Sequence, residues 1–157
     1  MAPRWVVVHT ADARRGHAVT AAARDALTRA TVDAHVDFVP LQDLDSCDIQ
    51  PDRVIVIGGD GTLNLAANWL QTMQSQSPIA IVPAGTGNNL ASGLDVPQEP
   101  SRALSIAAQG QVPRPVDAVS IHSDHDEQLM LQSAAFGFPQ RSRVTTTTGD
   151  VGRHYAS

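Results

Sequence analysis

The chain contains the stretch Gly58-Gly59-Asp60-Gly61-Thr62-Leu63-Asn64. It follows an apolar run at 54–57, Val-Ile-Val-Ile, which is typical of a buried strand, and it leads into the helix-like sequence of residues 65–70. Glycine at such a turn lets the backbone adopt a positive φ and come close to a ligand. The helix N-terminus offers free N–H groups to an anion. The stretch therefore predicts a polyphosphate-binding turn between a strand and a helix.

Asp60 is the one carboxylate of this turn. It offers a hard oxygen ligand for Mg²⁺, or a base for a hydroxyl group. The alternative is a tight turn that is capped by Thr62, with Asp60 only favouring the helix dipole. The position of Asp60 between two glycines favours the binding site over this alternative.

A second glycine turn comes one strand further along. Residues 79–82, Ile-Ala-Ile-Val, predict a strand, and Pro83-Ala84-Gly85-Thr86-Gly87-Asn88-Asn89 then leads into residues 90–94. Thr86 and Asn88 supply uncharged hydrogen-bonding groups. Two such turns on successive parallel strands would lie side by side at the carboxyl edge of one sheet, where open α/β sheets bind their ligands.

Together the two turns, GGDGTLN and PAGTGNNLA, resemble the catalytic domain of the diacylglycerol kinase family, which includes bacterial lipid kinases, sphingosine kinases and ceramide kinases. GGDGT also occurs in the related NAD kinases and phosphofructokinases, so it marks the superfamily. The G-T-G-N turn followed by Leu94-Asp95-Val96-Pro97 narrows the resemblance to the lipid kinases. Residues 114–117 with 134–138 look like the start of the family's second domain, and residues 152–156 weakly resemble a stretch that follows.

The resemblance implies an enzyme that transfers the γ-phosphate of ATP, with Mg²⁺, to a lipid hydroxyl such as that of diacylglycerol. Asp60 would be the catalytic and metal-binding residue, either holding Mg²⁺ or accepting the proton of the substrate. The residues that would bind the nucleotide come from both turns: Gly58, Gly59, Gly61, Thr62, Asn64, Gly85, Thr86, Gly87 and Asn88.

Composition excludes several other classes. Apolar residues make up 42% and charged residues 17% of the 157 residues, which is typical of a globular chain. A net charge of −5 argues against nucleic-acid binding. The single Cys47 cannot form an internal disulfide and fits a reducing cytosol, and no run is long enough to span a membrane. A lipid kinase of this kind would be cytoplasmic and would meet the bilayer as a peripheral protein.

Strand and helix patterns alternate over the first part of the chain and predict a doubly wound α/β fold with a parallel sheet. The predicted strands are 5–8, 32–39, 54–57 and 79–82, and the predicted helices are 12–30, 62–73 and 100–107. From residue 114 the pattern changes to strands at 116–122 and 128–135, which predict an antiparallel hairpin around a polar turn. The sequence thus predicts a nucleotide-binding α/β domain at 1–113 and the beginning of an incomplete β-sandwich domain at 114–157.

Some positions depart from the family pattern. The first strand runs into His9-Thr10 where the family has Asn-Pro, Asn89 stands where aspartate is common, and Ser92 where arginine is common. The family's second domain extends well beyond the length present, so we expect a fragment, inactive alone, whose cleft is completed by a missing C-terminal β domain or a dimer partner. A non-catalytic or degenerate nucleotide-binding module and an NAD-kinase-like enzyme are the alternatives. The His122-x-x-His125 pair predicts solvated polarity and not a metal site.

Overall fold

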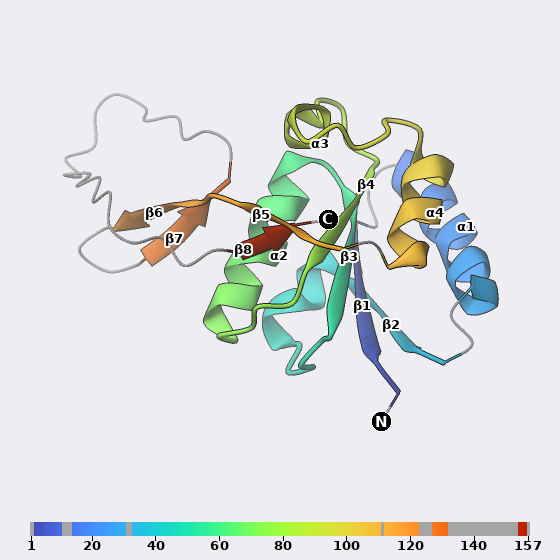
Figure 1. The fold of residues 1–157 in the computed structure, drawn as a ribbon, viewed down its shortest axis with the longest axis horizontal. Coiled ribbons are helices and arrows are strands. Elements are labelled where there is room, and N and C mark those ends of the chain that lie inside the picture. Colours follow the sequence, from blue (N-terminus) through green and yellow to red (C-terminus); the bar gives the residue numbers. More distant parts are fainter. Residues whose placement is uncertain are drawn as a thin grey trace.

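A computed structural model describes residues 2–10, 14–30, 33–110, 112–122, 127–131 and 154–156. Within them the order of elements is β1 (Arg4–His9), α1 (Arg14–Ala30), β2 (His35–Pro40), the 3₁₀ helix η1 (Leu41–Ser46), β3 (Arg53–Gly58), α2 (Asp60–Thr72), β4 (Ile79–Pro83), α3 (Asn89–Gly93), α4 (Pro100–Gln109), β5 (Arg114–Val116), β6 (Val119–His122), β7 (Glu127–Met130) and β8 (His154–Ala156) (Figure 1).

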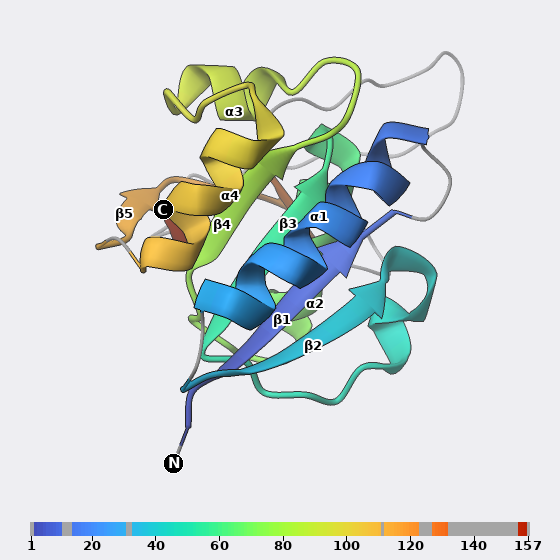
Figure 2. The ribbon, with the colours of Figure 1, turned by 90° about the vertical axis from the view of Figure 1, so that its right-hand side faces the viewer.

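The central sheet has the order β2-β1-β3-β4-β8-β5, and its first four strands are parallel. β8 runs parallel to β4 and antiparallel to β5. Figure 2 shows the four parallel strands pointing to the same edge, with α1 and α4 across one face. The prediction of a doubly wound α/β fold is confirmed.

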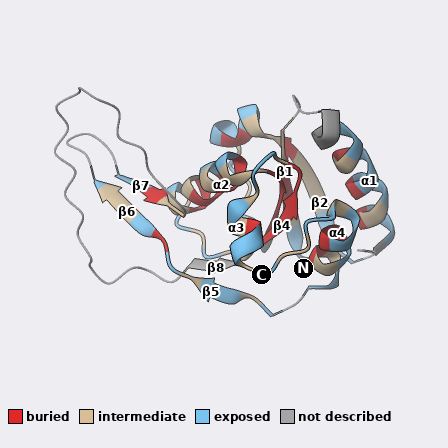
Figure 3. Cartoon of the chain, turned by 90° about the horizontal axis from the view of Figure 1, so that it is seen from above, coloured by how far each residue is buried: buried red, intermediate tan, exposed pale blue. Residues whose placement is uncertain are grey.

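The sheet is buried on both faces because its strands alternate between two apolar clusters. Val6 and Val8 of β1 pack with the α2 side, whereas Val7 packs with α1 and α4. The same alternation holds in β3, where Val54 and Ile55 lie on opposite faces. Burial on both faces explains why these strands are continuous apolar runs in the sequence. Figure 3 shows this buried layer between the helices.

The predicted antiparallel hairpin is confirmed, but its first strand begins at Val119 and not at residue 116, because Val116 belongs to β5, which pairs with β8. β6 pairs antiparallel with β7, from Val119↔Met130 to His122↔Glu127, and the pair forms a sheet of its own. It lies beside α2, away from α1 and α4. The polar turn at 123–126, His125, the end of the second predicted strand at 132–135, the motif at 134–138 and residues 152–153 lie outside the described residues.

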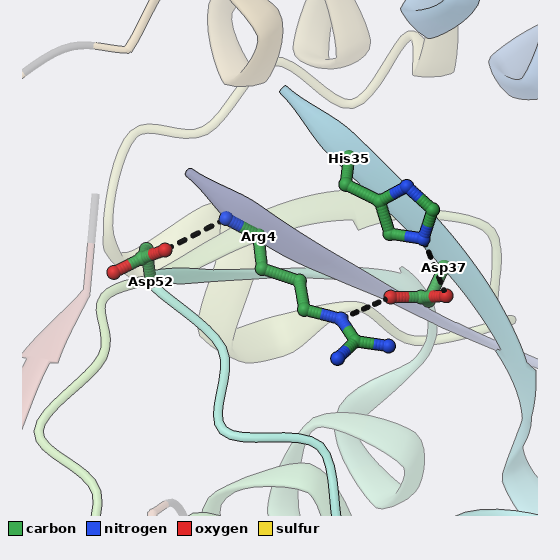
Figure 4. A network of polar contacts seen from close by, with 4 residues as sticks. All are labelled: Arg4, His35, Asp37 and Asp52. Atoms are coloured by element: carbon green, nitrogen blue, oxygen red, sulfur yellow. Dashed lines mark hydrogen bonds and ion pairs between the residues drawn. The ribbon is translucent and has the colours of Figure 1, made fainter. Parts of the chain in front are cut away.

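Polar side chains at the amino-terminal edge of the sheet satisfy one another (Figure 4). Asp37 accepts from Arg4 Nε at 2.7 Å and lies 3.2 Å from His35 Nε2. The Arg4 backbone N–H donates to Asp52 Oδ2 at 2.7 Å. The hydrogen bond from Arg4 holds the pKa of Asp37 below its ordinary value. At this edge, ion pairs and hydrogen bonds among these side chains therefore connect β1 with β2 and with the residue before β3.

Candidate nucleotide-binding site

The two glycine turns lie against each other at the carboxyl edge of the sheet. The Ala84 N–H donates to the Gly58 carbonyl at 2.9 Å. A Cβ on Gly85 would lie 2.5 Å from the Cα of Gly59, which is closer than carbon atoms can approach. The sequence prediction that these turns meet is borne out by this contact. Backbone meets backbone here, so Gly85 is required for the contact.

The glycines of the first turn do not have the positive φ that the sequence predicts for them. Within the described residues Gly110, at the end of α4, is the glycine with positive φ, and Gly59 has an extended φ of −104°. The expectation of positive φ at this turn is therefore wrong. Gly58 instead leaves room for the buried Thr62, whose Oγ1 would lie 2.5 Å from a Cβ on Gly58. Gly61, in the first turn of α2, has nothing within 4 Å of its Cβ position.

Asp60 connects the two turns. Its Oδ2 accepts from the Asn89 N–H and its Oδ1 from the Leu90 N–H, both at 3.0 Å. These N–H groups begin α3, so the carboxylate of one turn caps the helix that follows the other. Each carboxylate oxygen keeps a second lone pair for another partner. Asp60 thus holds the two turns together by hydrogen bonds and is also the candidate metal ligand.

Asn88 shapes the second turn from within. It has left-handed backbone angles, φ 51° and ψ 40°, which asparagine tolerates better than most residues. Its Oδ1 accepts from the Gly85 N–H at 3.1 Å and its Nδ2 donates to the Gly85 carbonyl at 2.9 Å. Its side-chain amide therefore holds the turn closed, while Thr86 and Gly87 at the tip are exposed.

The N-terminus of α2 has no side-chain cap. Its N-cap residue is Gly59, which has no side chain, and within the described part of the chain no side chain accepts from the first N–H groups of the helix. In contrast, Glu99 caps α4 by accepting from the N–H groups of Ser101 and Arg102. Thr62 therefore does not cap this turn, which contradicts that part of the alternative interpretation. An uncapped helix start beside an open glycine offers donors to an anion.

The sheet order places this helix start at the expected ligand crevice. β2 lies on one side of β1 and β3 on the other, so the order in which strands are added to the sheet reverses between β1 and β3. Ligands of open α/β sheets bind at the carboxyl edge of such a point. β3 ends there at Gly58, directly before α2, and β1 ends there at His9. Burial, followed by the nearby Arg24, lowers the pKa of His9 and so favours the neutral form of its imidazole.

Asn64 has its side chain engaged elsewhere. Its Oδ1 accepts from the Leu131 N–H at 3.2 Å, beyond the end of β7. One turn further along α2, Asn68 accepts from the Leu129 N–H at 2.7 Å and donates to the Leu129 carbonyl at 3.0 Å. The sequence prediction did not include Asn68. Two asparagines four residues apart on a largely apolar helix were the available signal.

The residues at the turns could supply Mg²⁺ with one protein ligand, and the remaining ligands would come from phosphates and waters. In the described part of the chain, no three His, Cys, Asp or Glu residues cluster around a common point. Asp60 alone supplies a carboxylate at the turn, and Mg²⁺ is commonly held by one or two carboxylates together with phosphates and waters. A separate cavity of about 730 Å³ between α1 and α4 is lined by none of the predicted site residues.

The family model of the diacylglycerol kinase catalytic domain matches residues 5–121. The chain belongs to this family. A protein of Pectobacterium atrosepticum described as a probable lipid kinase, YegS-like, is 34% identical over 102 residues, which are 64% of this chain and 32% of that protein. One of the same description from Chromohalobacter salexigens is 36% identical over 98 residues, 61% of this chain and 29% of that protein.

Solved structures agree with the fold. A diacylglycerol kinase structure from Bacillus anthracis str. Sterne superposes with a TM-score of 0.62 at 23% identity, covering 80% of this chain and 45% of that one. The chain spans about a third of the length of the curated relatives named above. The resemblance drawn from the two glycine turns is thus confirmed at the level of the family. No helix in the described ranges is both long and apolar enough to cross a bilayer.

Proposed function

We propose that this chain carries the nucleotide-binding part of an ATP-dependent lipid kinase, which transfers the γ-phosphate to a lipid hydroxyl such as that of diacylglycerol. The observation that supports the proposal most is the uncapped N-terminus of α2 beside the paired glycine turns. Phosphoryl transfer depends on positioning and charge neutralisation more than on covalent chemistry by the protein. An uncapped helix start supplies both at the phosphates.

The residues have distinct roles in this proposal. Gly59 and Gly61 let the phosphates approach the N–H groups that open α2, and Gly58 makes room for Thr62 at the same helix start. Gly85, Thr86, Gly87 and Asn88 form the opposite wall. Asp60 keeps the two walls together and has lone pairs left for Mg²⁺, directly or through water, or for the proton of the substrate hydroxyl. Bound Mg²⁺ would neutralise charge on the phosphates.

Residues 1–113 would form the nucleotide-binding domain, and residues 114–157 would begin a β-rich second domain. The separate β6–β7 sheet supports this division, whereas β5 and β8, from the same part of the chain, extend the central sheet beyond β4. The second domain would bind the lipid and hold its hydroxyl against the nucleotide. The protein would act in the cytoplasm as a peripheral membrane protein. Positioning can account for roughly 7–11 kcal/mol of barrier lowering. We therefore expect negligible lipid phosphorylation by these 157 residues alone.

A non-catalytic nucleotide-binding module is the second candidate. It is favoured by one observation: both oxygens of Asp60 already accept backbone hydrogen bonds, which gives this carboxylate a structural reason to be present. The two candidates share the nucleotide site and differ only in turnover.

The test is transfer of radiolabelled phosphate from ATP to diacylglycerol and to sphingosine in mixed micelles. The chain would be assayed alone and joined to the C-terminal part of the Pectobacterium relative. Turnover by the joined protein, and not by the chain alone, is the expected result. Robust turnover by the chain alone would contradict the expected inactivity. Nucleotide binding without turnover in the joined protein would favour the binding module.

A further inference from the structure

A pair of asparagines on α2 holds a strand by its backbone. Asn68 both accepts from the N–H and donates to the carbonyl of Leu129, and Asn64 accepts from the N–H of Leu131. A helix normally has no main-chain groups left for a neighbouring strand, because its own ladder uses them. Here side-chain amides on the helix surface make the hydrogen bonds that a neighbouring strand would otherwise make with β7. We call Asn64 and Asn68 the asparagine clamp.

The spacing of the clamp matches the spacing of the strand. Residues four apart on a helix are separated by about 6 Å along its axis, and residues two apart on a strand by about 6.8 Å. Outward-facing N–H groups recur at every second strand residue. Asn64 pairs with Leu131 and Asn68 with Leu129, so the strand runs antiparallel to α2. A shift of β7 by one residue would turn its outward groups away from both asparagines.

Apolar contacts between α2 and the hairpin specify the register of β7 less strictly than the hydrogen bonds of the asparagine clamp do. A small cavity of about 40 Å³ lies between the hairpin and α2, α3 and β4, and Leu63, Ala67, Leu129 and Leu131 are among the side chains that line it. Leu129 is nevertheless buried, with 4% of its surface exposed. Its N–H and carbonyl therefore lack ready access to solvent and depend on Asn68. Loss of such partners leaves buried polar groups unpaired, which is costly.

The clamp joins the hairpin to the nucleotide site through one rigid element. α2 begins at Asp60, in the first glycine turn, and carries Asn64 and Asn68 in its next two turns. We propose that Asn64 and Asn68 are positioning residues that set the register of the β6–β7 hairpin relative to the phosphate-binding turns. On the proposed kinase function, on which this consequence rests, the clamp places the opening strands of the lipid-bearing half against the nucleotide half.

The two asparagines make different bonds, so one substitution separates them. Asn64 acts toward the strand only as an acceptor, and Asn64→Asp keeps that acceptor. Asn68 acts as both acceptor and donor, and Asn68→Asp removes the donor and faces a carboxylate toward the Leu129 carbonyl. We expect Asp to restore the clamp at position 64 and to fail at position 68, whereas Leu fails at both positions.

Amide hydrogen exchange measured by NMR on the chain tests this directly. Asn68→Leu should speed exchange of the Leu129 amide about tenfold or more, because its acceptor is lost. Asn64→Leu should do the same for the Leu131 amide, and Asn64→Asp should return that amide to its original rate. Thr72→Ala, one turn further along α2, is the matched control and should leave both amides unchanged. The Met130 amide, which faces β6, reports whether the hairpin itself persists.

A second arm separates positioning from simple support. Saturating Mg²⁺-ADP should slow exchange of the Leu129 amide in the unchanged chain and have no effect in Asn68→Leu, which should still bind the nucleotide. Unchanged Leu129 exchange in Asn68→Leu, or equal responses of positions 64 and 68 to Asp, would overturn the proposal. Nucleotide slowing of Leu129 that persists in Asn68→Leu would also contradict it. If the unchanged chain binds no nucleotide, the proposed function fails, while the exchange measurements without nucleotide still decide the clamp.

Discussion

The two edges of the parallel sheet treat their polar groups in opposite ways. At the amino-terminal edge, Arg4, His35 and Asp37 form a closed network, and Asp52 accepts the first N–H of β1. At the carboxyl edge, the start of α2 has no side-chain cap, and the surface beside Gly61 is open. One edge is satisfied by its own side chains, and the other leaves donors for an outside partner.

The carboxyl edge also has the more demanding backbone. Its two turns touch through Gly59 and Gly85, and Asp60 binds across them to the start of α3. The amino edge is built from exposed side chains of ordinary strands. The comparison teaches that the functional edge is ordered by backbone contact and the other edge by side-chain charge. Substitutions at the two edges should therefore differ sharply in size.

The largest effect is expected at Gly85. Gly85→Ala puts a methyl group 2.5 Å from the Cα of Gly59, and backbone cannot move aside as a flexible side chain can. We expect a loss of about 2–4 kcal/mol of unfolding free energy, measured by urea denaturation. Gly61→Ala is the control, because its Cβ meets nothing and alanine favours helix; it should be neutral or stabilise by about 0.5–1 kcal/mol. Equal losses in both variants would contradict the backbone contact.

Asp60 comes next, because it connects the two turns. Asp60→Ala leaves the N–H groups of Asn89 and Leu90 without their acceptor, and we expect a loss of about 2 kcal/mol in stability together with loss of nucleotide binding. Denaturation and titration calorimetry with Mg²⁺-ATP measure the two effects. Asp60→Asn retains one acceptor oxygen and should recover part of the stability. Normal stability in Asp60→Ala would show that the hydrogen bonds of Asp60 to Asn89 and Leu90 do not contribute to the free energy of unfolding.

Gly61→Val separates binding from folding. A branched side chain in this open position should occupy the space through which phosphate reaches the start of α2, while the helix itself persists. We expect at least about a tenfold weaker affinity for Mg²⁺-ADP, which is 1.4 kcal/mol, with the helical circular dichroism signal largely retained. A variant that binds normally would mean that the first turn is only structural.

The smallest effect is expected at the amino edge. The Arg4 hydrogen bond depresses the folded-state pKa of Asp37, so this stabilisation is present above the unfolded-state pKa and is lost as pH falls through the folded-state pKa. Asp37→Asn should cost no more than about 0.5 kcal/mol at pH 7, since Arg4 is exposed to solvent and Asp37 is partly so. The difference from the unchanged chain should shrink as the pH falls through the depressed folded-state pKa of Asp37, because the protonated carboxyl no longer pairs with Arg4. A larger cost at pH 3 than at pH 7 would reverse the assignment.

The sequence predicted the sheet well because its strands are buried on both faces. Continuous apolar runs at 54–57 and 79–82, each followed by glycines, could be read without knowing any partner. η1 was missed because a 3₁₀ helix of only six residues, Leu41–Ser46, is too short to show a periodicity that distinguishes it from a loop. Helix α4 runs two residues beyond the predicted end at 107, to Gln109, and its C-cap Gly110 has the positive φ that favours glycine.

The bonds within the site depend on tertiary contacts that no local pattern contains. Asp60 finds its donors 29 and 30 residues later in the chain. Asn68 bonds to Leu129, which lies 61 residues later in the chain, in a strand of the second sheet. The residue types at the site were therefore predictable from chemistry and resemblance, whereas their actual bonds followed from the packing of the second glycine turn and the hairpin.

The contrast between the edges is tested most directly by an ¹⁵N NMR titration of the chain with Mg²⁺-ADP up to millimolar concentration. The account predicts saturable amide shifts at Gly61 and Thr62 and across residues 85–88. It predicts no shifts at Arg4 and Asp37, and none at Ser101 and Arg102, whose N–H groups Glu99 already caps. No shifts at millimolar nucleotide, or shifts centred on the amino edge or on the start of α4, would contradict the assignment of the uncapped α2 terminus as the phosphate site.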